Sequence, residues 1–250
     1  MESWTTVFLT AAGFFAGLVD SIAGGGGLIS LPALLAAGVP PHTALATNKV
    51  QSAIGTTFST YRYLKEGFVF LPVAGTAFIA SFAGSFAGAW TVMRVPGSSL
   101  ATVIPAFLVA ISVLTFVRKR FGAADTFTFR PAWHLPLAAG FALVLGFYDG
   151  FFGPGTGSFL ALGFVTFFRF GFVRATGNAK ITNLASNYAA IVAFVLGGHV
   201  YWNIALLMGV ANTAGAWIGS GLAITRGVKI IKPVFAVVLA GLLVKILFFR

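Results

Sequence analysis

The fold of this chain is decided by the stretch GFFAGLVDSIAGGGGLISLPALLAAGVPPHTALATNK, residues 13–49. It opens as an apolar segment, meets an acid at Asp20, and breaks at the four glycines 24–27. Each glycine inside a helix costs about 1 kcal/mol relative to alanine, so a helix is expected to end at this break. A short apolar segment follows, and after two prolines another begins that carries Lys49.

The composition is that of a polytopic membrane protein. Of the 250 residues, 58% are hydrophobic and only 8% are charged, whereas a soluble domain carries about 25% charged residues. Several apolar runs reach the roughly 20 residues that span a bilayer. The net charge of +11 comes mainly from Lys and Arg at the ends of apolar runs. There they act as orientation signals toward the cytoplasmic face, and no nucleic-acid partner is expected.

The chain lacks the residues of common cofactor and enzyme sites. It contains no cysteine, and its only histidines are His42, His134 and His199, so neither thiolate chemistry nor a histidine-built metal site is expected. A Walker motif and the Gly-x-Ser-x-Gly and His-Glu-x-x-His motifs are absent as well. No cofactor, no metal and no enzymatic activity are therefore predicted.

Two short apolar segments stand out among the longer ones. The apolar segments fall at 5–23, 28–38, 43–64, 68–93, 97–117, 135–151, 158–168, 175–197, 200–224 and 230–249. Segments 28–38 and 158–168 each follow a glycine-rich break, which predicts half-helices. Hydrocarbon offers no water to the backbone groups at such a break, so the break must be buried in protein or line a polar cavity.

The second half of the chain repeats the first. The matching pairs are GLVD 17–20 with GFYD 146–149, the glycines 24–27 with GPGTG 153–157, ATNK 46–49 with ATGNAK 175–180, Ala83-Gly84 with Ala214-Gly215, and PAF 105–107 with PVF 233–235. Broken segments at corresponding places of two halves are the best sequence indication of a transporter's binding site. We assign 1–120 to the first transmembrane repeat, 121–134 to a connecting loop and 135–250 to the second repeat.

The distribution of basic loops favours one of two topologies. If each broken segment crosses the membrane, a repeat has four crossings and the basic loops divide evenly between the two faces. If it re-enters and leaves on its own side, a repeat has three crossings and most basic loops share one face, as the positive-inside rule requires. The predicted fold is an all-α membrane protein with two inverted repeats, each a glycine-broken re-entrant hairpin with about three long helices. Both termini then lie outside.

Lys49 and Lys180 lie inside apolar segments at equivalent places of the two repeats. A charge at the bilayer centre costs roughly 2.5–3.5 kcal/mol, so such a group usually has a partner or a task. One interpretation is that the lysines bind an anion. The other is that each pairs with an acid to hold the halves together, or extends to an interface.

Asp20 and Asp149 each precede a glycine break by four residues and are two of only five acids in the chain. Burial would favour their protonated forms, which suits proton coupling. An intramembrane ion pair with the repeat lysines is an equally good interpretation.

The glycine breaks also have two interpretations. Their backbone N–H groups, at the start of the half-helix that follows, could point at an anionic substrate with the positive end of the helix dipole behind them. Alternatively the glycines only permit close packing, as expected for Gly13-x-x-x-Gly17, Gly84-x-x-x-Gly88 and Gly215-x-x-x-Gly219. We favour the first for the two breaks. The predicted substrate-binding residues are Gly25, Gly26, Gly27, Asn48, Lys49, Gln51, Gly155, Thr156, Gly157, Asn178, Lys180, Asn183 and Asn187.

The motifs DSIAGGGG 20–27, PAL 32–34 and ALATNK 44–49 resemble those of the TauE/SafE family of bacterial permeases, and ATGNAK 175–180 with NLASN 183–187 is similar to that family's second repeat. The likeness covers essentially the whole chain. It implies a duplicated transporter of about eight helices that moves sulfur-containing anions such as sulfite, thiosulfate or sulfoacetate. Pro154 and Thr156 depart from the glycines of the first repeat, and two extra residues precede Lys180.

The sequence thus predicts a secondary transporter of the inner membrane for a small sulfur-containing oxyanion, working by alternating access. Proton coupling through Asp20 and Asp149 stays open beside their pairing with the lysines. An anion channel of the same architecture is the alternative. The expected partners are the oxyanion and membrane lipid, and a homodimer stays open as the assembly state.

Overall fold

The structure, a computed structural model, describes residues 3–117 and 125–227 of the chain. These residues form nine α-helices, in agreement with the all-α prediction. The helices are α1 (Ser3–Ala23), α2 (Gly27–Ala36), α3 (Pro41–Lys65), α4 (Leu71–Val92), α5 (Gly97–Val117), α6 (Pro131–Phe151), α7 (Thr156–Phe168), α8 (Phe172–Leu196) and α9 (Trp202–Arg226). The expected segment 230–249 and part of the connecting loop 121–134 lie outside the described residues.

Five helices of the described part are long and apolar enough to cross a membrane, namely α1, α4, α6, α8 and α9. Helix α3 is 25 residues long, as long as α8 and α9, but it is much less hydrophobic. Several of its polar residues face protein, because Thr47, Asn48, Lys49 and Gln51 are all buried. Part of the low hydropathy of α3 therefore results from a polar interior.

Both glycine breaks end a helix as predicted. After α1, Gly24 and Gly25 have φ of 76° and 100°, and after α6, Gly153 and Gly155 have φ of 96° and 86°. Residues with a side chain rarely adopt this left-handed conformation, so the backbone can turn there at low cost only with glycine. The short helices α2 and α7 follow these turns directly.

Contacts at the helix termini define the two ends of the bundle. At the end that we call the histidine end, the His42 ring of α3 lies 3.2 Å from the Val92 carbonyl of α4 and stacks on His199, which precedes α9. At the opposite end, the arginine end, Arg174 of α8 lies 3.3 Å from Asp125. Helices α3 and α9 begin at the histidine end, and α4 and α8 begin at the arginine end.

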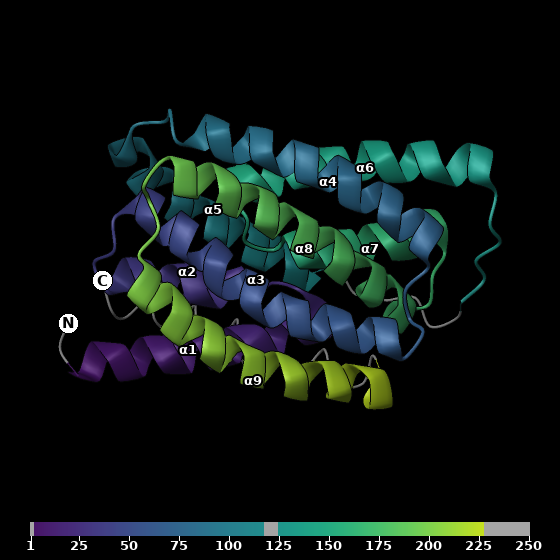
Figure 1. The fold of residues 1–250 in the computed structure, drawn as a ribbon, viewed down its shortest axis with the longest axis horizontal. Helices are drawn as coiled ribbons and strands as arrows, with labels where there is room; N and C mark the ends of the chain where they lie inside the picture. Colours follow the sequence, from purple (N-terminus) through teal and green to yellow (C-terminus); the bar gives the residue numbers. More distant parts are fainter. Residues whose placement is uncertain (1–2, 118–124, 228–250) are drawn as a thin grey trace.

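Small residues hold neighbouring helices in close parallel contact. A β-carbon on Gly17 of α1 would overlap the Asn212 carbonyl of α9, and one on Gly219 would overlap the Leu18 carbonyl. A β-carbon on Gly84 of α4 would likewise overlap a carbonyl of α6. These contacts confirm the packing that the Gly-x-x-x-Gly motifs predict. Figure 1 shows α1 beside α9 at one edge of the bundle and α4 beside α6 at the other.

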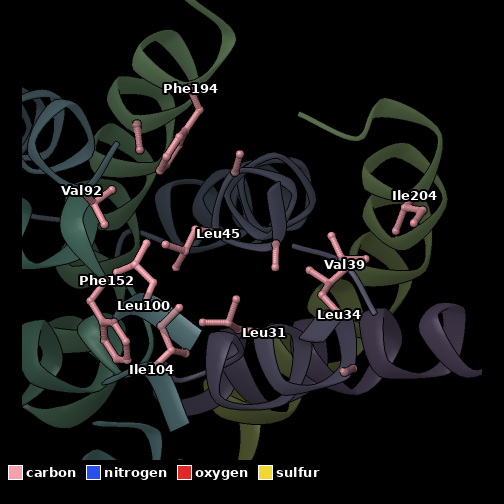
Figure 2. Packing of buried hydrophobic residues seen from close by; sticks show 14 of the residues in the cluster. Leu31, Leu34, Val39, Leu45, Val92, Leu100, Ile104, Phe152, Phe194 and Ile204 are labelled. Atoms are coloured by element: carbon pink, nitrogen blue, oxygen red, sulfur yellow. The ribbon is translucent and has the colours of Figure 1, made fainter. Parts of the chain in front are cut away.

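The two half-helices are embedded in separate apolar clusters. Leu31 and Leu34 of α2 belong to one cluster with Leu45, Leu100 and Phe194 from α3, α5 and α8, and Figure 2 shows Leu34 beside Val39. Helix α7 packs in a second cluster with α4, α6 and the start of α8. Because α1 is parallel to α9, the hairpin α1–α2 begins and ends at the histidine end. The hairpin α6–α7 begins and ends at the arginine end, and each apolar half-helix starts at its glycine break inside the bundle.

Candidate functional site

Two buried ion pairs join the first half of the chain to the second. The Lys49 Nζ of α3 lies 2.8 Å from a carboxylate oxygen of Asp149 at the end of α6. The Lys180 Nζ of α8 lies 2.6 Å from a carboxylate oxygen of Asp20 at the end of α1. The side chains of both lysines are at most 3% exposed. The interpretation in which a lysine extends toward the headgroups is therefore wrong for both residues, whereas the pairing interpretation holds.

Polar neighbours complete the shell of each carboxylate. Asp149 accepts hydrogen bonds from the Ser186 hydroxyl at 2.5 Å and from the Asn183 amide at 3.4 Å. Asp20 accepts from the Gly26 backbone N–H at 3.3 Å and from the Thr56 hydroxyl at 3.5 Å. Such hydrogen bonds are what make a buried ion pair tolerable, since Coulomb attraction alone rarely offsets the cost of removing both charges from water.

The two glycine breaks touch each other between the pairs. A β-carbon on Gly24 would overlap the backbone of Gly157 and Ser158, at the start of α7. The Ser158 hydroxyl donates a hydrogen bond of 2.9 Å to the Ala23 carbonyl, the last residue of α1. The tip of one hairpin thus supplies a donor to the open helix end of the other. A β-carbon on Gly153 would lie 3.0 Å from the Lys49 Nζ, so the second break packs directly on that ammonium group.

A narrow polar cavity lies where these elements meet, with room for about one water molecule. Its lining combines backbone at the two breaks with amide, hydroxyl and charged side chains. The lining residues are Asp20, Gly25, Gly27, Asn48, Lys49, Ser52, Asp149, Gly153, Gly155, Thr156, Gly157, Asn183 and Asn187. An oxyanion with several oxygens does not fit this space as it stands, so its entry requires the hairpins or the ion pairs to move.

Most of the predicted site residues line this cavity. They are Gly25, Gly27, Asn48, Lys49, Gly155, Thr156, Gly157, Asn183 and Asn187, together with the two acids Asp20 and Asp149.

The remaining four predicted residues lie elsewhere. Gly26 donates its N–H to Asp20, and Lys180 reaches the site through its pair with the same carboxylate. Asn178 accepts a hydrogen bond of 3.2 Å from the Phe70 N–H, where it caps the start of α4. Gln51 does not line the cavity; its amide nitrogen donates to Asn48 at 3.0 Å.

Other residues of the site were not among the predicted ones. Ser52 and Gly153 line the cavity, and Ser186 bonds to Asp149. Ser52 is three residues after Lys49 and therefore shares its helix face, which marks it as one of the neutral donors beside that lysine even though it is not in the predicted binding set. Gly153 has no such signal apart from its membership in the glycine run.

Within the residues that the structure describes, no group of three or more His, Asp or Glu side chains could hold a metal ion. The charged groups at the cavity are two ammonium and two carboxylate groups. They can exchange partners with each other, with a proton or with an incoming anion.

Comparisons with known proteins identify relatives of the chain. A family model described as "Sulfite exporter TauE/SafE" matches residues 9–246. The chain is 41% identical over 242 residues to "Probable membrane transporter protein ORF9" of Sinorhizobium sp, covering 96% of this chain and 91% of that protein. It is 37% identical over 257 residues to "Probable membrane transporter protein YfcA" of Escherichia coli K12, covering 99% and 95%. No solved structure matches the chain significantly.

Proposed function

Because the chain belongs to the sulfite exporter TauE/SafE family, we propose that it moves a small sulfur-containing oxyanion across the inner membrane by alternating access. It is a multi-pass membrane transporter and not an enzyme. The proposed substrates are sulfite, thiosulfate or a sulfonate such as sulfoacetate.

The observation that carries this proposal is the burial of two ammonium groups beside a polar cavity at the glycine breaks. Lys49 lines the cavity directly, and its present counter-ion is Asp149. A transported oxyanion would replace that carboxylate on the lysine. The Asn183 and Asn187 amides would supply hydrogen bonds without adding negative charge. Charge-assisted hydrogen bonds of this kind are roughly twice as strong as neutral ones.

Exchange of partners at Lys49 also gives a route to proton coupling. When an oxyanion occupies the lysine, the Asp149 carboxylate, which is only 1% exposed, loses its cation inside the protein. An unpaired buried charge is costly, so the carboxylate then takes up a proton. We therefore propose that anion and proton bind together at this pair.

Substitution of Asp149 tests the coupling. Asp149→Asn keeps the shape of the side chain and the hydrogen bond from Ser186, but it neither takes up a proton nor pairs with Lys49. The variant should bind the anion at least as tightly as the wild type while losing uptake that is driven by a pH gradient. Undiminished proton-driven uptake would rule out Asp149 as the coupling group.

We also propose that the halves 1–120 and 135–250 are inverted repeats joined by the loop 121–134. Support comes from opposite helix directions: α1 and α3 start at the histidine end, and the equivalent α6 and α8 start at the arginine end. The basic residues support an arginine end that faces the cytoplasm. Those at helix termini of this end are Lys65, Arg130, Arg169, Arg174 and Arg226.

Cysteine labelling tests the inversion, since the chain has no native cysteine. Arg94 follows α4 and Arg226 ends α9, which are equivalent helices of the two repeats. In intact cells, a membrane-impermeant maleimide should label Arg94→Cys, and it should label Arg226→Cys only after permeabilisation. Labelling of both from the same side would reject the inverted arrangement.

Uptake into proteoliposomes tests the transport function itself. Purified protein is reconstituted and offered labelled sulfite, thiosulfate and sulfoacetate, with sulfate and a carboxylate for comparison, under an imposed pH gradient. At least one sulfur-containing anion should accumulate against its electrochemical gradient. Uptake that stops at equilibrium would indicate an anion channel instead, and no uptake of any sulfur anion would overturn the proposal.

A further inference from the structure

A chain of hydrogen bonds runs from α9 to the cavity and involves a residue that neither the site nor the transport function has used. The Asn212 Nδ2 of α9 donates to the Gln51 Oε1 at 2.6 Å. The Gln51 Nε2 donates to the Asn48 Oδ1 at 3.0 Å. The Ser30 hydroxyl of α2 donates to the same Asn48 oxygen at 2.5 Å. We call these four residues, Asn212, Gln51, Asn48 and Ser30, the amide relay.

The packing of α9 sets the direction of the relay. A β-carbon on Gly55 of α3 would overlap the Asn212 Oδ1, and one on Gly17 of α1 would lie 2.7 Å from it. The glycine hydrogen atoms that a side chain would replace therefore point at this oxygen. A carbonyl oxygen accepts such weak C–H donors, whereas the NH₂ group would meet hydrogen with hydrogen. Asn212 is held with its oxygen toward the glycines and its NH₂ toward Gln51.

This direction leaves one donor of Asn48 for a ligand. The Asn48 Oδ1 is occupied by Gln51 and Ser30, so the Nδ2 turns the other way, toward Gly27 at the start of α2. Among the described residues no hydrogen bond of this Nδ2 is found, although Asn48 is only 3% exposed. Asn48 lines the cavity. An amide donor that no described residue accepts from, on a side chain that lines a polar cavity, is a place for an acceptor atom of a ligand.

The second half of the chain lacks the relay. Counted from the repeat lysines and from the Ala-Gly pairs, Asn48 corresponds to Ala179, Gln51 to Thr182, and Asn212 to Ser81. The Thr182 hydroxyl bonds within its own helix, and the Ser81 hydroxyl is buried without a hydrogen-bond partner in the described part of the chain. Helices α4, α6 and α8 pack closely without such amides, so close packing of these helices does not require them.

We propose that Asn212 is a positioning residue that acts through Gln51 to turn Asn48, so that the Asn48 Nδ2 donates a hydrogen bond to an unprotonated oxygen of the transported anion. This inference rests on the proposed transport of a sulfur-containing oxyanion. It makes the site asymmetric, because the corresponding residues of the second half, Ala179, Thr182 and Ser81, form no such relay in the described part of the chain. It also defines the ligand class more narrowly, as an anion with a free acceptor oxygen near Gly27.

The test is the initial rate of labelled thiosulfate uptake into proteoliposomes. Asn212→Leu and Gln51→Met each break the relay without changing charge. Each should raise KM about fivefold, the effect of one lost hydrogen bond, and leave kcat unchanged. Ser81→Ala is the matched control in the other half and should keep the wild-type KM. If Asn212→Leu does not fold, as judged by gel filtration, Gln51→Met carries the test.

A double-mutant cycle separates positioning from a structural role. In an Asn48→Ala background, Asn212→Leu should raise KM no further, because its effect acts only through the Asn48 amide. A further rise in the double variant, or a loss of kcat at wild-type KM, would overturn the proposal. If wild-type protein transports thiosulfate and every relay variant has the wild-type KM, the role of the relay is disproved while the transport function stands. If wild-type protein transports none of the sulfur anions, the proposed function fails first.

Discussion

The Lys49 ammonium of α3 lies 2.8 Å from the Asp149 carboxylate of α6, with both side chains at most 3% exposed. The partners belong to different halves of the chain and lie 100 positions apart in sequence. The pair therefore both joins the halves and holds a positive charge beside the cavity. Each role predicts a different result on substitution.

Breaking the pair on one side should destabilise the protein more than removing it whole. Lys49→Met leaves a buried carboxylate without its cation, and this should lower the free energy of unfolding by about 3–5 kcal/mol. The double variant Lys49→Met/Asp149→Leu should regain most of that loss. Chemical unfolding in detergent measures both variants, with the exposed Lys65→Met as control. A single variant as stable as the wild type would contradict the structural role.

Contact between the hairpin tips should make Gly24 far less tolerant of substitution than Gly38. Both have a positive φ, of 76° and 79°, but a β-carbon on Gly24 would overlap the backbone of α7, whereas one on Gly38 would meet nothing within 4 Å. Gly38→Ala should cost only the backbone strain, about 1–2 kcal/mol. Gly24→Ala should carry at least the same backbone strain, and it should also abolish uptake because its β-carbon would overlap α7.

Thermal unfolding and uptake of the two alanine variants check this prediction side by side. Equal behaviour of Gly24→Ala and Gly38→Ala would mean that the tip contact is unimportant.

Stability should fall in mild acid because of the histidine end. Burial, and then the neighbouring His42, lower the pKa of His199 below its ordinary value of 6.5. In mild acid the unfolded chain therefore binds more protons at His199 than the folded chain does. The effect on stability is absent at neutral pH, and the free energy of unfolding falls as the pH drops below about 6.5. Melting temperatures between pH 7.5 and 5 measure the effect.

His199→Gln is the control for the acid effect and should flatten the pH dependence. A wild-type profile that is already flat in this range would contradict the lowered pKa.

The sequence was sufficient to predict where the helices end. Four glycines in a row at 24–27 leave few alternatives to a break, and the observed helix boundaries lie within four residues of the predicted ones in the described chain. The same reasoning placed Lys49 and Lys180 inside long helices, but it left open whether their side chains are buried or extend to an interface. Local chemistry decides these features, and local chemistry is visible in the sequence.

Pairings between distant segments were not predictable in the same way. Asn178 and Asn183 share a polar helix, yet Asn178 caps α4 and Asn183 reaches the cavity. Two pairings depend on how α1, α6 and α9 are placed around α3. One is the choice of carboxylate that pairs with Lys49, and the other is the hydrogen bond from Asn212 to Gln51. Helix periodicity shows which residues share a face but not which neighbour that face meets.

The central claim is that an oxyanion takes the place of the carboxylate on Lys49, and equilibrium binding to a folded, uncharged variant tests it most directly. Lys49→Met/Asp149→Leu removes both charges and so leaves neither partner buried without its counter-ion, and a loss of binding would not reflect unfolding. The labelled sulfur anion that wild-type protein takes up best is titrated against both proteins. We predict that the wild type binds and that the double variant does not. Binding of equal affinity by the two proteins would contradict the account.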